Sequence, residues 1–130
     1  MNGQHTYNLR VEWTGNRGVG TSNYKVYERS HTIIVDNKPD ILASADPSFR
    51  GDKTKHNPED LLVASLSACH MLSYLHLCAV SGVIVTDYID NATGIMIETP
   101  DRWRTFFRSY FKSNCNRIRK LNDRKGKRTA

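Results

Sequence analysis

Apolar and polar positions alternate along the first third of the chain in a way that is typical of β-strands. Residues 6–13 alternate and end at a run of turn residues, 14–18, so they predict a first strand. Residues 24–35 are rich in β-branched and aromatic side chains and predict a second strand. After a polar turn at 36–40, residues 41–45 predict a short third strand.

A long helix is predicted to follow a polar loop at residues 46–56. Asn57 can cap it, Pro58 suits its first position, and two acidic residues come next, at the positive end of the helix dipole. The helix is predicted to cover about 58–81 and to end before Gly82. Its apolar residues surround most of its circumference, so we expect a buried, central helix rather than a surface helix. They are Leu61, Leu62, Val63, Ala64, Leu66, Ala68, Met71, Leu72, Leu75 and Leu77.

Strand patterns return after the helix. Residues 83–89 alternate, 90–94 are turn residues, and 95–98 begin another strand. The order of strands, one buried helix and strands again predicts an α+β fold. The sequence contains no internal repeat and no glycine-rich phosphate loop.

The charge divides the chain into two kinds of sequence. Its 130 residues suffice for one domain and hold 19 Lys and Arg against 13 Asp and Glu, a net charge of +6. Residues 1–101 contain 8 basic and 12 acidic residues, net −4, whereas 102–130 contain 11 basic residues and one acidic residue, net +10. We therefore expect a domain at 1–101 and a basic tail at 102–130.

The sequence does not predict a membrane protein or a secreted protein. The most apolar stretch, 61–85, is interrupted by two histidines and several serines, so no membrane-spanning segment is expected. The N-terminus has no signal-peptide pattern, which leaves the cytoplasm as the expected location. Three cysteines, Cys69, Cys78 and Cys115, are too few for a secreted disulfide scaffold.

Two of the cysteines lie in the predicted helix. Cys78 is nine residues after Cys69, about 180° around the helix, so the two cannot form a disulfide within it. We interpret Cys78 as a packing residue, and Cys69 taken alone would also suit a helix core. His70 points about 100° away from Cys69. Only His76 shares a face with Cys69 among the nearby Cys and His residues, so no metal site is predicted.

A longer motif surrounds Cys69. Asn-Pro-Glu opens the helix, Cys69 comes ten residues after the glutamate, and a glycine precedes the next strand, in HNPEDLLVASLSACHMLSYLHLCAVSGVIVTDYIDNATG. This stretch resembles the signature of the OsmC/Ohr family, the osmotically inducible and organic-hydroperoxide-resistance proteins. Residues 13–15, 20–21 and 49–52 are also similar to members of that family. The resemblance covers about residues 6–99.

The resemblance implies an OsmC-like fold with antiparallel strands flanking the helix, in an intertwined homodimer. It also implies a cytoplasmic, peroxiredoxin-like antioxidant enzyme of the oxidative stress response, which reduces organic hydroperoxides with a thiol reductant and without a cofactor. By resemblance, Cys69 is the peroxidatic cysteine and Glu59 helps to orient a catalytic arginine. Since Glu59 and Cys69 are about 15 Å apart along the helix, a joint role needs that arginine or a partner subunit. Arg17, Arg29 and Arg50 are the candidates, and Arg50 is favoured.

The resemblance stops near Asp101. Family members continue with a strand, a helix and a second cysteine, but Cys115 lies in no such motif and is not assigned as a resolving thiol. The tail can be interpreted as a basic amphipathic helix for nucleic acid or an anionic membrane, or as a disordered extension. The third interpretation is a frameshift. If the coding sequence is read one nucleotide later from Trp103 onward, codon degeneracy permits a sequence with an alternating strand and a helix start.

We favour the frameshift, which would make the chain a truncated, incomplete OsmC-like domain with impaired activity. Whether it is an enzyme is left open, because the second cysteine motif is missing. The alternative function is a non-catalytic OsmC-like protein whose basic tail binds nucleic acid or an anionic lipid surface.

Overall fold

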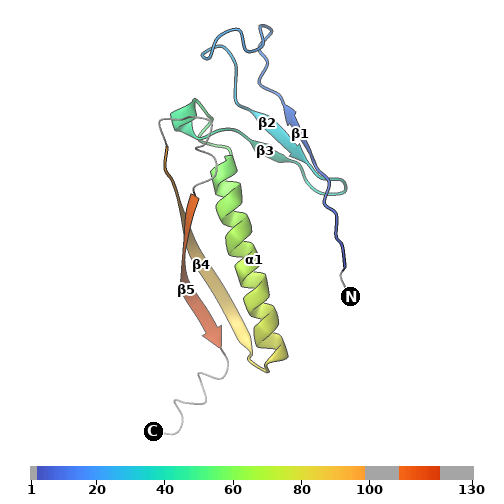
Figure 1. Ribbon diagram of the computed structural model, residues 1–130, viewed down its shortest axis with the longest axis vertical. Helices are drawn as coiled ribbons and strands as arrows, with labels where there is room; N and C mark the ends of the chain where they lie inside the picture. Colours follow the sequence, from blue (N-terminus) through green and yellow to red (C-terminus); the bar gives the residue numbers. More distant parts are fainter. Residues whose placement is uncertain (1–2, 99–108, 121–130) are drawn as a thin grey trace. The chain divides into compact units, whose positions relative to one another are not determined.

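The computed structural model describes residues 3–98 and 109–120 of the chain (Figure 1). The chain forms two compact units, Met1–Pro58 and Glu59–Ala130, and each is described by itself. The parts of the predicted basic tail at 102–108 and 121–130 lie outside the described residues.

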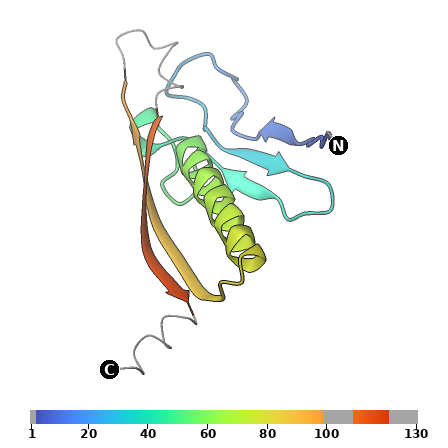
Figure 2. The same cartoon turned by 60° about the horizontal axis from the view of Figure 1, so that its bottom comes forward.

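The first unit is built on a three-stranded antiparallel sheet with the order β1-β2-β3 (Figure 2). β1 (Arg10–Trp13) pairs with β2 (His31–Ile34), and β2 pairs with β3 (Ile41–Ala43). The first and third strands fall within the two segments predicted for them and are shorter than predicted.

The segment before β2 is a loop, so the strand predicted for residues 24–35 is present only in its second half. In a paired strand, the backbone carbonyls of Tyr24 and Tyr27 would accept hydrogen bonds from a neighbouring strand. Here they accept hydrogen bonds from the guanidinium group of Arg29, at 2.6 and 2.5 Å. The loop therefore satisfies its backbone through a side chain rather than through a neighbouring strand.

A tight loop follows β3. It contains one 3-10 turn, η1 (Pro47–Phe49), and the side chain of Asp46 caps this turn by accepting a hydrogen bond from the amide of Ser48 at 2.8 Å. The amide of Gly51 donates to the carbonyl of Asp46 at 3.1 Å. A Cβ atom at position 51 would overlap the backbone of Ala45, so the close approach of these two segments requires glycine.

The second unit contains the long helix α1 (Pro58–Val80), whose bounds agree with the predicted helix to within one residue. Gly82 follows with a φ of 73°, a conformation that favours glycine. The helix is less buried than predicted, because the sheet of its own unit covers only one side, and Cys78 is its one buried residue. The large apolar residues that α1 exposes are Leu62, Leu66, Leu72, Leu77 and Val80.

By length and composition, α1 could also cross a membrane, with a mean hydropathy of 1.5 over an 18-residue window. This property does not test the expectation that the chain has no membrane-spanning segment, which stays a prediction. Length and composition do not place the helix in a membrane, since they equally suit a helix that packs between apolar protein surfaces.

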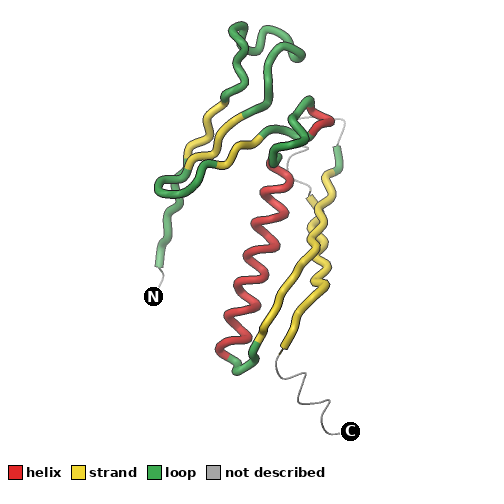
Figure 3. The backbone as a smooth tube through the Cα atoms, turned by 180° about the vertical axis from the view of Figure 1, so that it is seen from behind, coloured by secondary structure: helices red, strands yellow, loops and turns green. Residues whose placement is uncertain are grey.

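One face of α1 packs along β4 (Val85–Met96), and the two run in opposite directions (Figure 3). The hydroxyl of Ser67 donates to Oδ2 of Asp90 at 2.7 Å. About two turns later, the ring of Tyr74 lies 6.0 Å from the ring of Tyr88, centroid to centroid. These contacts fix which face of α1 is turned toward the sheet.

β4 is one continuous strand, so the turn predicted at residues 90–94 is wrong. Each of these residues pairs with β5 (Ser109–Lys120) in an antiparallel ladder. Gly94 shows why the prediction failed: a Cβ atom there would overlap the side chain of Val63 in α1. This glycine permits a close helix approach rather than a turn.

β5 lies within the predicted basic tail. Its pairing with β4 overturns the helical and disordered interpretations for residues 109–120. Strands pair through their backbone groups, so a segment can pair without an alternating pattern of apolar and polar residues. The lack of this pattern in residues 109–120 is why the strand was not predicted.

Candidate functional site

Cys69 lies in the middle of α1, on the face turned away from β4. Ser67, which contacts Asp90 of β4, is two residues earlier, and such residues are about 200° apart around a helix. Cys69 is accordingly an exposed, free thiol. Leu66 and Leu72, about one turn before and after it, share this face and are also exposed. The surroundings of the thiol on α1 are therefore open and apolar.

Cys78 differs from Cys69 in the way that the helical period predicts. It is a free cysteine on the opposite side of α1 and is buried, with 8% of its surface exposed. Nine residues correspond to about 13.5 Å along a helix, whereas a disulfide needs Cα atoms within about 7 Å. Cys78 therefore cannot pair with Cys69 while α1 is intact.

Glu59 lies in the first turn of α1. Its Oε2 atom is buried and has no hydrogen-bond partner among the described residues. A buried carboxylate oxygen without a donor is unfavourable, so this side chain is suited to accept a hydrogen bond from a cation. Because Glu59 and Cys69 lie on one continuous helix, about 15 Å apart along its axis, they do not touch directly.

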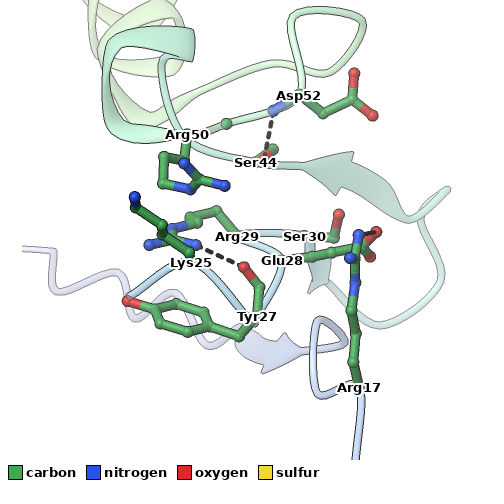
Figure 4. A pocket seen from close by; sticks show the side chains of 10 residues that line it. Arg17, Lys25, Tyr27, Glu28, Arg29, Ser30, Ser44, Arg50 and Asp52 are labelled. Atoms are coloured by element: carbon green, nitrogen blue, oxygen red, sulfur yellow. Dashed lines mark hydrogen bonds and ion pairs between the residues drawn. The ribbon is translucent and has the colours of Figure 1, made fainter. Parts of the chain in front are cut away.

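The first unit holds a cavity of about 310 Å³ between the β1–β2 connection and the loop after β3 (Figure 4). The three arginines that the sequence presents as alternatives, Arg17, Arg29 and Arg50, all line it, together with Lys25. In Figure 4 the side chains of Lys25, Arg29 and Arg50 gather at one end of the cavity, and Arg17 lies at the other.

Arg17 is neutralised by a neighbouring acid. Its guanidinium group donates to Oε1 of Glu28 at 2.5 Å, in an ion pair that is largely exposed to solvent. The backbone of Glu28 is held as well, since its carbonyl accepts from the indole of Trp13 at 2.8 Å and its amide donates to Gly15 at 3.0 Å. Arg17 and Glu28 thus form a fixed wall of the cavity.

Arg29 is fixed by two aromatic rings and two carbonyls. Its guanidinium carbon lies 3.8 Å from the ring centre of Tyr27 and 4.4 Å from that of Tyr24. These cation–π contacts add to the hydrogen bonds that it donates to the carbonyls of the same two tyrosines. The sequence predicted a strand over residues 24–35, whereas Arg29 within this segment is half-buried in a loop, which it organises.

Arg50 is the least constrained of the three. It ends η1 in a left-handed conformation, with φ 62° and ψ 27°, which is uncommon for a residue other than glycine. It is exposed, and within the described part of the chain no hydrogen bond or ion pair engages its guanidinium group or the ammonium group of Lys25. These two cations are therefore available to a ligand.

Two buried serines complete the cavity wall. Ser44, 1% exposed, accepts a hydrogen bond from the amide of Asp52 at 3.0 Å, and Ser30, 8% exposed, accepts one from Lys55 Nζ at 3.1 Å. A hydroxyl that accepts one hydrogen bond still has its own proton to donate. The sequence did not single out Lys25, Ser30 or Ser44, because residues 24–35 and 41–45 were interpreted as strands.

Asp52 lines the cavity, but its carboxylate is hydrogen-bonded to Thr54. Its carboxylate accepts from the hydroxyl of Thr54 at 2.6 Å and from the Thr54 amide at 2.9 Å. These hydrogen bonds, the one from the hydroxyl first, lower the pKa of Asp52 below its ordinary value of 3.8. In Figure 4 the carboxylate points away from the three clustered cations.

No group of three or more His, Cys, Asp and Glu side chains that could hold a metal ion occurs among residues 3–98 and 109–120.

Comparison with known proteins supports the fold. No protein-family model matches the chain, and no curated protein matches it. Among solved structures, the chain is similar to an OsmC-like protein of unknown function from Vibrio cholerae, with 28% sequence identity and a TM-score of 0.68. The match covers 95% of this chain and 84% of that one, so it extends well past Asp101. The chain therefore has an OsmC-like fold, a helix combined with antiparallel sheet.

Proposed function

We propose that this OsmC-like chain reduces organic hydroperoxides at Cys69, with an external thiol as the reductant. The observation that supports this most directly is the exposed thiol of Cys69 on α1, within an OsmC-like fold. A peroxide must reach the sulfur, and Cys69 is exposed whereas Cys78 is buried. The exposed side chains of Leu66 and Leu72 give an alkyl peroxide an apolar surface next to the thiol.

The proposed reaction has two steps. The Cys69 thiolate attacks the outer oxygen of the hydroperoxide, the O–O bond breaks, and the alkoxide takes up a proton, which leaves a sulfenic acid and an alcohol. A dithiol then reduces the sulfenic acid, so that the thiol is restored, water is released and the reductant becomes a disulfide. Because no resolving cysteine is assigned in this chain, each turnover depends on the external reductant, and we expect a low rate.

Arg50 is proposed as the cation that assists Cys69, and Glu59 as the acid that orients it. Three observations support the choice of Arg50: Arg17 is occupied by Glu28, Arg29 is held by tyrosine rings and carbonyls, and Arg50 has no partner among the described residues. Glu59 has a buried oxygen that lacks a donor. A neighbouring arginine would favour the thiolate form that the reaction requires.

Consumption of cumene hydroperoxide in the presence of a dithiol tests the proposal. We expect catalysis by the full chain, and a loss of about a hundredfold or more on Cys69→Ser, because the nucleophile is removed. Cys78→Ala is the matched control and should keep most of the rate, provided that its circular dichroism shows a folded protein. Equal rates for Cys69→Ser and the unsubstituted chain would contradict the proposal.

A further inference from the structure

The cavity of the first unit is lined by more basic than acidic side chains. We infer that it is a binding site for a small oxyanion, a carboxylate or phosphate group, held by Lys25, Arg29 and Arg50. The site lies within the first unit and shares Arg50 with the role proposed beside Cys69. Lys25 and Arg29 have no such role, so anion binding can be tested without the peroxide reaction.

The charges that line the cavity do not cancel. Four basic side chains face it, against two acidic ones. Of the two acids, Glu28 is paired with Arg17, and Asp52 is engaged by Thr54 and points away from the cluster. The end formed by Lys25, Arg29 and Arg50 therefore keeps about three positive charges without a counterion from the described chain.

Such a cluster is unfavourable without an anion, because like charges that lie close together repel one another. Planar guanidinium groups also match the geometry of carboxylate and phosphate oxygens, which they can bind with two parallel hydrogen bonds. An oxyanion is thus the ligand class that the cluster fits.

The site is also organised in advance. The tyrosine rings and carbonyls hold Arg29 in one place, and only part of its five N–H groups is used in doing so. The hydroxyls of Ser30 and Ser44 each retain a proton that can be donated to an anion. Donors that are already positioned lose little conformational freedom when the ligand binds.

The size of the cavity limits the ligand. Its volume of about 310 Å³ lies at the lower end of the range of about 300–1,000 Å³ that is usual for small-molecule sites. Its walls offer few apolar groups, with Tyr27 the one large ring among them. We therefore expect a compact, polar ligand rather than an extended lipid chain.

Titration of the full ¹⁵N-labelled chain with inorganic phosphate, and separately with acetate, tests this inference at constant ionic strength. Binding at the cavity should give saturable shifts of backbone amide signals at Ser44, Gly51 and Asp52. Saturation by phosphate alone would identify a phosphate site, and saturation by acetate a site that accepts carboxylates. Shifts that rise linearly with both salts and spread over the whole chain would overturn the inference.

Three substitutions separate a built site from general surface charge. Lys25→Ala removes one of the positively charged side chains that bind the anion. It should weaken binding about tenfold, the loss expected for a charge-assisted hydrogen bond. Lys38→Ala removes the same charge from the exposed turn between β2 and β3 and should leave the affinity unchanged. Equal weakening by the two substitutions would contradict the site.

Arg50→Gly provides a third variant in which loss of binding cannot be attributed to unfolding. Glycine adopts the φ of 62° at this position without strain, so the fold should be retained while the guanidinium group is lost. We expect an unchanged melting temperature within a few degrees and about tenfold weaker binding. Unchanged affinity of Arg50→Gly for the anion would overturn the assignment of Arg50 to the site. Cys69→Ser should bind the anion as the original chain does, whatever the outcome of the peroxide assay.

Discussion

At the scale of single residues, Asp52 links the stability of the first unit to pH. The Thr54 hydroxyl and amide lower the pKa of this carboxyl, so its ionised form stabilises the folded loop. For a lowered pKa, this contribution is present above the ordinary value of 3.8 and is lost as the pH falls below it. We therefore predict that Asp52→Asn makes the melting temperature less dependent on pH in that range.

Melting curves between neutral pH and pH 2.5 would check this prediction. Asp36→Asn is the matched control, because Asp36 lies in the exposed turn after β2, and this variant should follow the original chain. A pH profile of Asp52→Asn that is identical to that of the original chain would show that these hydrogen bonds do not contribute.

The two helix cysteines and the arginines show what the sequence can predict at this scale. The positions of Cys69 and Cys78 on opposite sides of α1 follow from helix geometry alone, and the exposure of each agrees with it. The grouping of Arg17, Arg29 and Arg50 around one cavity depends on how two irregular loops fold together. No periodicity relates such residues, so the sequence could name them only as alternatives.

At the scale of elements, the contact between α1 and β4 explains both a success and a failure of prediction. The bounds of α1 follow from its own sequence, because Asn57, Pro58 and Gly82 act locally. The residues 90–94 look like a turn when they are considered alone. Asp90 accepts a hydrogen bond from the helix, and Gly94 lets the helix approach, so tertiary contacts override the local preference.

Two serines on opposite faces of α1 test this contact. Ser67→Ala removes the donor to Asp90 and should lower the free energy of unfolding by about 1–2 kcal/mol, because the hydrogen bond to a charged group is partly buried. Ser65→Ala removes only a bond to the carbonyl of Leu62 within the helix and should change it by less than about 0.5 kcal/mol. Urea denaturation measures both, and equal effects would contradict the packing described.

At the scale of the whole molecule, we propose that the chain forms a homodimer, because α1 exposes several large apolar side chains. Such a long apolar surface is unfavourable in water and is typical of a protein interface. We predict a dimer in sedimentation experiments at micromolar concentration, and a weaker one for Val80→Lys, at the exposed end of α1 away from Cys69. Ser81→Lys, a change at an exposed polar position after the helix, should not weaken it. A monomeric original chain would contradict the proposal.

The frameshift stays a prediction for the region after Asp101. The pairing of β5 with β4, and a structural match that extends past Asp101, show that the present sequence can occupy this part of the fold. The abrupt change from net −4 to net +10 is the reason to keep the hypothesis. The nucleotide sequence downstream of codon 101 decides it: an alternative frame that encodes no OsmC-like strand and helix would exclude a frameshift.

Trapping of the oxidised cysteine tests the central claim, that Cys69 is the reacting thiol, most directly. The reduced chain is treated with one equivalent of cumene hydroperoxide together with dimedone, which binds sulfenic acids, and the modified residues are identified by peptide mass spectrometry. We predict one dimedone adduct, on Cys69, with one equivalent of alcohol formed and no adduct on the buried Cys78. Peroxide consumption without an adduct on Cys69, or an adduct on Cys78 in its place, would contradict the account.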